Sequence, residues 1–242
     1  MTAYNEQPNY KPLFVAPRDL AKNCIALIDR EARNAKRGRP ARIIAKVNAL
    51  VDPPVIRALY RASQAGVEID LIVRGQSALV PGLRGISSRI RVRSIVGRFL
   101  EHSRIFYFEN AGDPEIYLGS ADWMQRNLYE RVEVLFPLKD AELRRRIANE
   151  ILPVYLADTR SARLLGADGK YLRPRTSRNG HGMSAQEQLM RAAHRPASAF
   201  DTRAQKTKRN VHGAAYTSSA GSAAPDDPTA ESASQDSLNA SV

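Results

Sequence analysis

The sequence predicts an α/β domain with a mixed sheet and helices on both faces. Two short runs rich in β-branched residues, 41–48 and 67–75, flank a helical stretch over 54–64. A strand–helix–strand unit of these lengths is typical of two parallel strands joined by a right-handed crossover. Further strand-like runs and a long helix follow this unit.

The first helix is expected over residues 18–36. Leu20 and Cys24 recur there at helical spacing, and Cys24 is expected to fill a core position of the helix. The second helix is expected to begin at Asp52-Pro53, because an acidic residue before a proline in the first turn is a good helix start.

The remaining elements follow a glycine-rich, proline-containing loop over 75–88. They are strands at 89–95, 104–108, 115–119 and 131–136, a helix at 140–156, a short extension at 165–172 and a helix at 186–193. The last helix is expected to be isolated and to lie outside the core.

The composition divides the chain into a lead-in over 1–17, a folded domain over 18–172 and a low-complexity tail over 173–242. Beyond Arg173 the large aliphatic residues almost disappear, and Ser, Ala, Gln, Arg and Asp dominate. Such a stretch cannot bury enough apolar area to offset the entropy of the chain. We therefore expect a disordered C-terminal tail.

The charge of the chain indicates a polyanionic partner. The formal net charge is +12 and the isoelectric point is about 10.1, which favours nucleic acid, nucleotides, phosphate chains or an anionic membrane. A single cysteine excludes an intrachain disulfide and a cysteine-based metal site. No signal peptide and no run of roughly 18 apolar residues is evident. A cytoplasmic location is expected, with a peripheral position on the membrane as an alternative.

The stretch HSRIFYFE, residues 102–109, has the residue types of a phosphoryl site. His102, Arg104 and Glu109 follow the spacing H-x-R-x4-E, and residues two apart in a strand face the same side. An imidazole can move a proton or attack phosphorus, and a guanidinium can neutralise phosphoryl oxygens. We interpret His102 and Arg104 as catalytic. The alternative is an exposed histidine at a sheet edge.

The turn after the next strand, GSADWMQRN, supplies further candidates. Gly119 and Ser120 can let backbone N–H groups approach an anion. Arg126 and Asn127 either cap a helix or contact phosphate. The histidine signature and this turn resemble the phospholipase D superfamily, in which lysine and aspartate take the places of Arg104 and Glu109. The resemblance implies a phospholipase D-like α/β fold.

Other basic residues lie at or along strands. Arg74 ends an apolar strand before a glycine, and ligands of α/β sheets bind beyond the carboxyl ends of parallel strands. Arg74 is therefore either a phosphate ligand or a solvated arginine. Lys46 is a weaker candidate for a polyanion contact. Arg89, Arg91 and Arg93 share one strand face, as a polyphosphate track or as a solvated face.

Longer strings resemble one family more specifically, the C-terminal domain of polyphosphate kinase, the type that makes long polyphosphate from ATP. The matching strings are ALVDPPVIRALYRASQAGVEIDLIVRG, LVPG, IRVRSIVGRFLEHSRIFYF, GSADWMQRN and RVEVLFPL. The resemblance covers residues 10–172. It implies that Arg74 and His102 contact nucleotide phosphates. Mg²⁺ is expected to arrive with ATP, because the sequence has no carboxylate cluster that would bind it strongly.

The resemblance also implies what the chain lacks. In the family the phosphorylated histidine lies in a preceding domain, and N-terminal and helical domains precede that one. A chain without them is expected to be a truncated product, a split subunit or a detached domain, inactive in polyphosphate synthesis by itself. The family pattern is altered at Gln76 and at Tyr129-Glu130, where a cysteine-containing loop and a basic residue are common.

The expected function is binding of ATP and polyphosphate as part of reversible transfer of the terminal phosphate of ATP. Expected partners are ATP, ADP, polyphosphate and a separately encoded kinase fragment, with a homo-oligomer as a further option and no specific nucleic acid. The alternatives are a non-catalytic polyanion-binding or assembly module and a phosphodiesterase that acts as a homodimer.

Overall fold

The computed structural model describes residues 10–174 and 182–194, and within these ranges nine strands form one sheet in the order β1-β7-β6-β5-β2-β3-β4-β8-β9. The strands are β1 (Phe14–Ala16), β2 (Arg42–Val47), β3 (Glu68–Val73), β4 (Ile90–Ile95), β5 (Arg104–Phe108), β6 (Glu115–Gly119), β7 (Glu133–Pro137), β8 (Ala162–Leu165) and β9 (Tyr171–Leu172).

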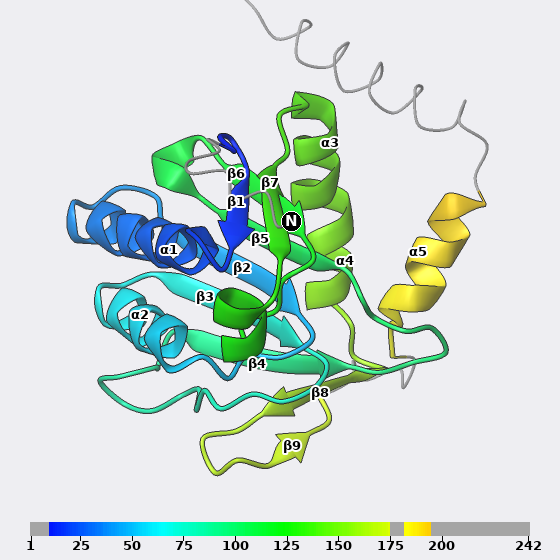
Figure 1. Ribbon diagram of the computed structural model, residues 1–242. Coiled ribbons are helices and arrows are strands. Elements are labelled where there is room, and N and C mark those ends of the chain that lie inside the picture. The colour runs from blue at the N-terminus through cyan, green and yellow to red at the C-terminus, as the bar shows by residue number, and fades with distance from the viewer. Residues whose placement is uncertain (1–9, 175–181, 195–242) are drawn as a thin grey trace, which may run out of the picture. The chain divides into compact units, whose positions relative to one another are not determined.

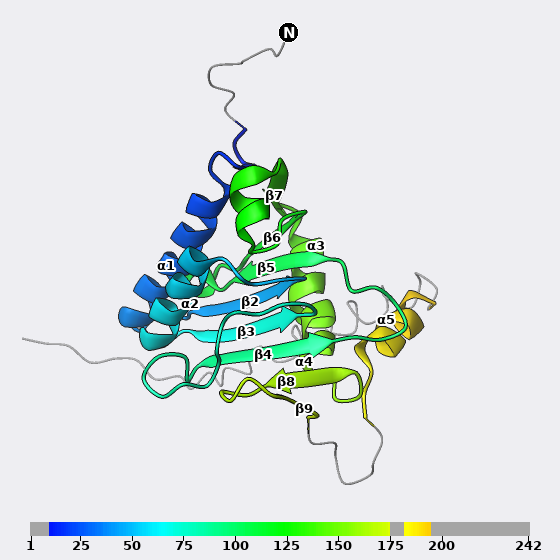
Figure 2. The same ribbon diagram turned by 60° about the horizontal axis from the view of Figure 1, so that its bottom comes forward.

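The centre of the sheet is parallel and both flanks are antiparallel. β2 pairs with β3 and β3 with β4 in parallel, whereas β5 runs antiparallel to β2. Figure 2 shows β2, β3 and β4 side by side with their arrowheads at one edge. The predicted mixed sheet and its parallel pair are confirmed. Because β5 is reversed, its first residue lies at the same edge as the last residues of β2 and β3.

The helices are α1 (Leu20–Lys36), α2 (Pro53–Gln64), α3 (Ala141–Arg146), α4 (Leu152–Leu156) and α5 (Ala185–Ala193), with short turns η1 (Asn110–Gly112), η2 (Arg126–Glu130) and η3 (Ile147–Ile151). α1 and α2 cover one face of the sheet and α3 to α4 the other (Figure 1). The predicted long helix over 140–156 is therefore one helical stretch with a π-helical turn, η3, in its middle.

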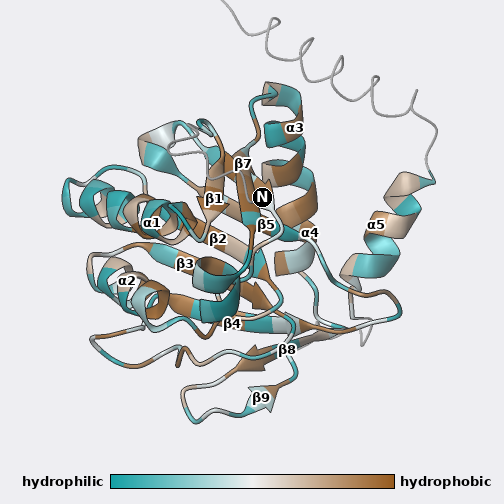
Figure 3. Ribbon diagram, in the orientation of Figure 1, coloured by the Kyte–Doolittle hydropathy of each residue, from teal (hydrophilic) through white to brown (hydrophobic). Residues whose placement is uncertain are grey.

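Apolar side chains along β2 point alternately to the two faces of the sheet, so helices must pack on both faces. Ile43 and Ala45 pack in the large core under α1 and α2, and Ile44 packs on the opposite face with Leu152 of α4. β2 and β3 are buried over nearly their whole length, and in Figure 3 α1 and α2 alternate between brown and teal. The strands are thus buried on both faces, and the helices are amphipathic.

Two local predictions about helices are confirmed. The carboxylate of Asp52 accepts a hydrogen bond from the backbone N–H of Val55 at 3.1 Å, so it caps α2 before Pro53. Cys24 lies in the core, and burial raises the pKa of its thiol to about 12.

The prediction that the helix over 186–193 stands outside the core is wrong. Ala185, the first residue of α5, is fully buried in a cluster with Ile95 and Tyr155. The composition of this stretch did not predict the packing, because a single small apolar side chain at the start of a helix is enough to complete an apolar cluster. The predicted extension over 165–172 takes part in the β8–β9 hairpin. Residues 175–181 and 195–242 of the predicted tail lie outside the described residues.

None of the helices in the described part of the chain is both long and apolar enough to cross a membrane.

Candidate functional site

The candidate residues meet at the edge of the sheet where β2 and β3 end and β5 begins. Asn48 follows β2 directly, Arg74 follows β3 directly, and Arg104 is the first residue of β5. Parallel β2 and β3 bring the first two together, and the antiparallel β5 brings the third (Figure 2). This is the edge at which ligands of α/β sheets bind.

Arg74 is held by one nitrogen only. Its Nε donates to Oδ1 of Asn48 at 2.6 Å. Among the described residues no carboxylate lies within ion-pairing distance of Arg74. A guanidinium carries five N–H donors, so the terminal nitrogens of Arg74 remain for an anionic ligand.

Asp122 links the residues at the ends of β2 and β5. Its Oδ1 accepts from the backbone N–H of Asn48 at 2.7 Å, and both of its oxygens lie within 3.2 Å of the Asn48 amide nitrogen. Arg104 binds the same carboxylate with two nitrogens, at 2.9 and 3.2 Å. Asp122 is buried. Asp122 is not among the predicted site residues, and its only signal in the sequence is an acidic residue inside the turn that follows β6.

His102 and Arg104 lie side by side, as predicted. Nη1 of Arg104 donates to the carbonyl oxygen of His102 at 2.9 Å and lies 3.1 Å from each of its ring nitrogens. His102 precedes β5 and is exposed, so its place follows from these contacts and not from strand alternation. Glu109 lies beyond the other end of β5, where it accepts from the hydroxyl of Tyr107 at 2.5 Å, and it takes no part in this site.

Lys46 is not a surface cation. It is buried, with Nζ 3.0 Å from a carboxylate oxygen of Glu101 and 2.9 Å from Oγ of Ser103, and it lies over the ring of Tyr155. Burial lowers the pKa of Lys46, although the carboxylate of Glu101 acts in the opposite direction. The expected polyanion contact is therefore replaced by an internal ion pair, because the even-numbered face of β2 is covered by α4.

With this geometry in place, the comparisons with known proteins decide the family. The family model for polyphosphate kinase C-terminal domain 2 matches residues 13–186. The chain belongs to the polyphosphate kinase family. It is 56% identical over 171 residues to the polyphosphate kinase of Thermosynechococcus vestitus, covering 71% of this chain and 23% of the relative. It is 54% identical over 180 residues to the polyphosphate kinase of Pseudomonas aeruginosa, covering 74% and 26%.

A solved polyphosphate kinase supports the same assignment. The crystal structure of the enzyme from Porphyromonas gingivalis matches with a TM-score of 0.73 at 41% identity, over 77% of this chain and 28% of that chain. The chain thus spans about a quarter of the length of these polyphosphate kinases.

The glycine–serine turn of this polyphosphate kinase domain is used inside the fold. Ser120 donates its backbone N–H to Val134 at 3.0 Å and its hydroxyl to Glu133, and Asn127 donates to Glu133 at 2.6 Å. A β-carbon on Gly119 would lie 2.1 Å from the carbonyl oxygen of Val134. The turn therefore fits the close approach of β7, and the N–H of Ser120 that we expected to meet an anion is already bonded.

Arg89, just before β4, and Arg91, within it, are neutralised by acidic residues of the sheet. Arg89 and Arg91 lie 2.6 and 2.9 Å from the carboxylate of Glu68, and Arg91 also lies 2.7 Å from Asp70. Both acids belong to β3, which pairs with β4 in parallel. The sequence left a polyphosphate track and a solvated face as alternatives for these arginines, and the structure shows that the neighbouring strand supplies carboxylates to Arg89 and Arg91.

Arg93 and Arg126, two further predicted phosphate contacts, differ in their exposure to solvent. Arg93 donates to the carbonyl oxygen of Leu156, and burial lowers its pKa. Arg126 is exposed at the start of η2. Of these two arginines, Arg126 is the exposed one.

Acidic residues do not gather into a metal centre in the described ranges: no group of three or more His, Cys, Asp or Glu side chains there could hold a metal ion. At the strand ends the oxygens of Asp122 already accept from Arg104 and Asn48, and the carboxylate of Glu101 pairs with Lys46. The residues present do not fit Mg²⁺, which prefers several oxygen ligands in octahedral geometry.

Proposed function

We propose that this chain binds ATP and inorganic polyphosphate at the strand ends and takes part in the reversible transfer of the terminal phosphate of ATP to polyphosphate. The observation that carries the proposal is that Arg74 lies at the same edge of the sheet as the pair formed by His102 and Arg104, to which Asn48 and Asp122 link it. Arg104 and Lys46 each have a carboxylate partner, whereas Arg74 has none among the residues that the structure describes. A phosphate group supplies the missing negative charge.

Each of the three residues has a distinct role in this proposal. Arg74 holds phosphate oxygens with its planar fork of donors. Arg104 is fixed by Asp122, so its charge faces the phosphoryl group without reorganisation as negative charge develops. His102 is exposed beside it and can donate or accept a hydrogen bond at the transferring group. Mg²⁺ enters with the phosphates of ATP and is not held by this chain.

Weaker members of the proposed site are the surface arginines of β4 and η2. Arg91 and Arg126 are exposed and can contact an extended polyphosphate, although Arg91 already shares its charge with Glu68 and Asp70. Ser120 and Asn127 would reach a phosphate only after leaving Glu133. We assign them the smallest contribution.

We further propose that other parts of a polyphosphate kinase complete the site, from a separately encoded fragment or in an oligomer. The support is an exposed apolar loop beside His102. Val96, Phe99 and Leu100 are 69%, 49% and 72% exposed. Apolar side chains gathered beside a site are typical of a surface that another protein covers.

Calorimetric titration of ATP and of a polyphosphate of defined length tests the binding proposal. His102→Ala and Arg74→Ala should each weaken binding about ten- to a hundredfold, the loss of a charge-assisted hydrogen bond of roughly 1.5–3 kcal/mol. Arg74→Lys should restore part of the affinity, because an ammonium lacks the planar fork.

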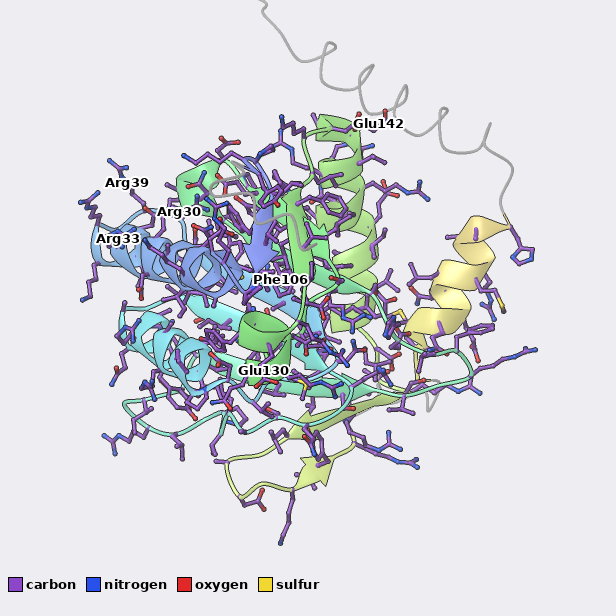
Figure 4. The ribbon with its side chains drawn as sticks, viewed as in Figure 1. Arg30, Arg33, Arg39, Phe106, Glu130 and Glu142 are labelled. Carbon is purple, nitrogen blue, oxygen red and sulfur yellow. The ribbon has the colours of Figure 1, made fainter. Side chains whose placement is uncertain are left out.

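The matched control is Arg33→Ala, which removes the same charge from the exposed end of α1 (Figure 4). Melting curves check that each variant folds. If both alanine variants bind as the wild type does, or if the control weakens binding equally, the strand ends are not the phosphate site.

A further inference from the structure

The loop between β4 and β5, residues 96–103, is tied to α5 by one side chain. The amide of Gln186 accepts from the backbone N–H of Phe99 at 3.0 Å and donates to the carbonyl oxygen of Phe99 at 2.8 Å. Both backbone groups of one residue are thus paired with one side chain, as they would be with a neighbouring strand. The two residues are 87 positions apart, so this contact depends on the fold.

The same amide also reaches the residue before His102. Nε2 of Gln186 donates to Glu101 at 2.7 Å, and the other oxygen of Glu101 lies 3.0 Å from Nζ of Lys46. Nζ of Lys46 also donates to Oγ of Ser103 at 2.9 Å. The residues on both sides of His102 are therefore anchored to buried groups, while the histidine ring faces solvent.

Gly97 is adapted to the same contact. A β-carbon at this position would lie 2.5 Å from Oε1 of Gln186 and 2.9 Å from its amide carbon. Any other residue would push the amide away from Phe99. The loop and the helix thus carry two separate features that serve one contact.

Few other contacts in the described part of the chain stabilise the conformation of this loop. The exposed side chains of Val96, Phe99 and Leu100 contribute little burial to its stability. The hydrogen bonds of Gln186 and the ion pair of Glu101 therefore hold the backbone. A site residue on a loop acts well only when supporting contacts fix that loop.

We propose that Gln186 is a positioning residue that holds the 96–103 loop so that His102 meets a bound phosphate in one arrangement. The inference rests on the proposed function, since it assigns the support of the same site. Without Gln186 the loop would become ordered only when polyphosphate binds. The conformational entropy lost in that ordering would then weaken the affinity for polyphosphate. The contact makes α5 a part of the phosphate site, although α5 holds none of its ligands.

The test uses the full chain with Gln186→Ala, and with Gln188→Ala as the matched control on the same helix. Hydrogen exchange of the Phe99 amide reports the contact, and calorimetric titration of polyphosphate reports binding. Gln186→Ala should make the Phe99 amide exchange at least about tenfold faster and weaken polyphosphate about two- to tenfold, the loss of roughly one hydrogen bond. Gln188→Ala should change neither quantity.

A double-mutant cycle separates positioning from a general loss of structure. If Gln186 acts through His102, Gln186→Ala should cost no further affinity in a chain that already carries His102→Ala. Gly97→Ala, which displaces the amide from the other side, should reproduce the single effect and serves if Gln186→Ala does not fold.

The outcomes distinguish the two proposals. A wild type that binds neither ATP nor polyphosphate overturns the proposed function, and the inference with it. A wild type that binds, with Gln186→Ala within twofold of it or additive with His102→Ala, overturns the inference alone. An unchanged exchange rate of Phe99 in Gln186→Ala also overturns it.

Discussion

Among single residues, Asp122 decides how the cations at the strand ends are arranged. Its carboxylate accepts from the backbone and side chain of Asn48 and from two nitrogens of Arg104. Asn48 in turn holds Arg74. One buried acid therefore orients Arg104 directly and Arg74 through an amide, while Arg74 meets no carboxylate in the described part of the chain.

We expect Asp122→Asn to lower the free energy of unfolding by about 3 kcal/mol or more, because it leaves the largely buried Arg104 without a counter-charge. Urea unfolding measures the change. Asp113→Asn, an exposed aspartate after η1, is the control and should stay within about ±0.5 kcal/mol of the wild type. A loss below about 1 kcal/mol would mean that Arg104 does not depend on this carboxylate.

Asp70 is the residue whose titration should be visible in acid. Burial alone would raise its pKa, but hydrogen bonds from Arg91 and Arg42 outweigh burial and hold that pKa below its ordinary value of 3.8. A carboxyl group with a depressed pKa stabilises the fold above its unfolded pKa, and the stabilisation is lost as the pH falls through the folded pKa.

We therefore expect Asp70→Asn to lower stability by roughly 1.5–3 kcal/mol at pH 7 and to flatten the fall in stability below pH 3.8. Urea unfolding at several pH values between about 2.5 and 7 measures both effects. Asp168→Asn, an exposed aspartate, should keep the steep wild-type fall. Parallel curves for Asp70→Asn and wild type would contradict the assignment.

Between elements, the contact of β6 with β7 explains the glycine in the GSADW turn. Gly119 pairs with Leu135, and a β-carbon there would lie 2.1 Å from the carbonyl oxygen of Val134 and 3.0 Å from Cα of Leu135. Backbone atoms cannot rotate away as a flexible side chain can. The two strands would have to separate to admit a larger residue.

Gly119→Ala should therefore cost about 1–3 kcal/mol in the free energy of unfolding, as overpacking does. Hydrogen exchange should show faster exchange in β6 and β7 than in β2 and β3. A variant of wild-type stability that binds polyphosphate less well would support the opposite interpretation, that Gly119 makes room for an anion.

Across the molecule, Asp158 joins the C-terminal elements to one another. This buried carboxylate accepts from the backbone N–H groups of Ser161 at 2.7 Å and Ala162 at 3.0 Å, and from Ala185 at 2.7 Å. The start of β8 and the start of α5 are thus held by one side chain that follows α4. The position of Gln186, one residue after Ala185, depends on this junction.

Asp158→Ala should lower the free energy of unfolding by about 3 kcal/mol or more, because it leaves buried N–H groups without acceptors. Thermal unfolding measures the loss, and hydrogen exchange should show that β8 and α5 lose protection together. Asp168→Ala in the β8–β9 hairpin is the matched control and should change little. Loss of protection in α5 alone would argue against a shared junction.

Much of the fold and part of the site could be predicted because they depend on local patterns. The apolar runs of β2 and β3, the cap at Asp52 and the spacing of α1 are readable within a few residues. Arg74 and Arg104 could be placed at the strand ends because each directly bounds an apolar run. Strand order was less accessible, since β7 lies beside β1 and β8 beside β4 only after folding.

By itself the sequence determined an α/β domain, its parallel strand pair, its positive charge and the basic residues at the strand ends. The tertiary structure alone decided which of those cations keeps an unbalanced charge. Asp122 reaches Asn48 across 74 positions, Glu101 pairs with Lys46, and Gln186 holds Phe99 across 87. Such partners are fixed by the register and order of strands and by the docking of α5, and the charge of a side chain says nothing about which carboxylate will meet it.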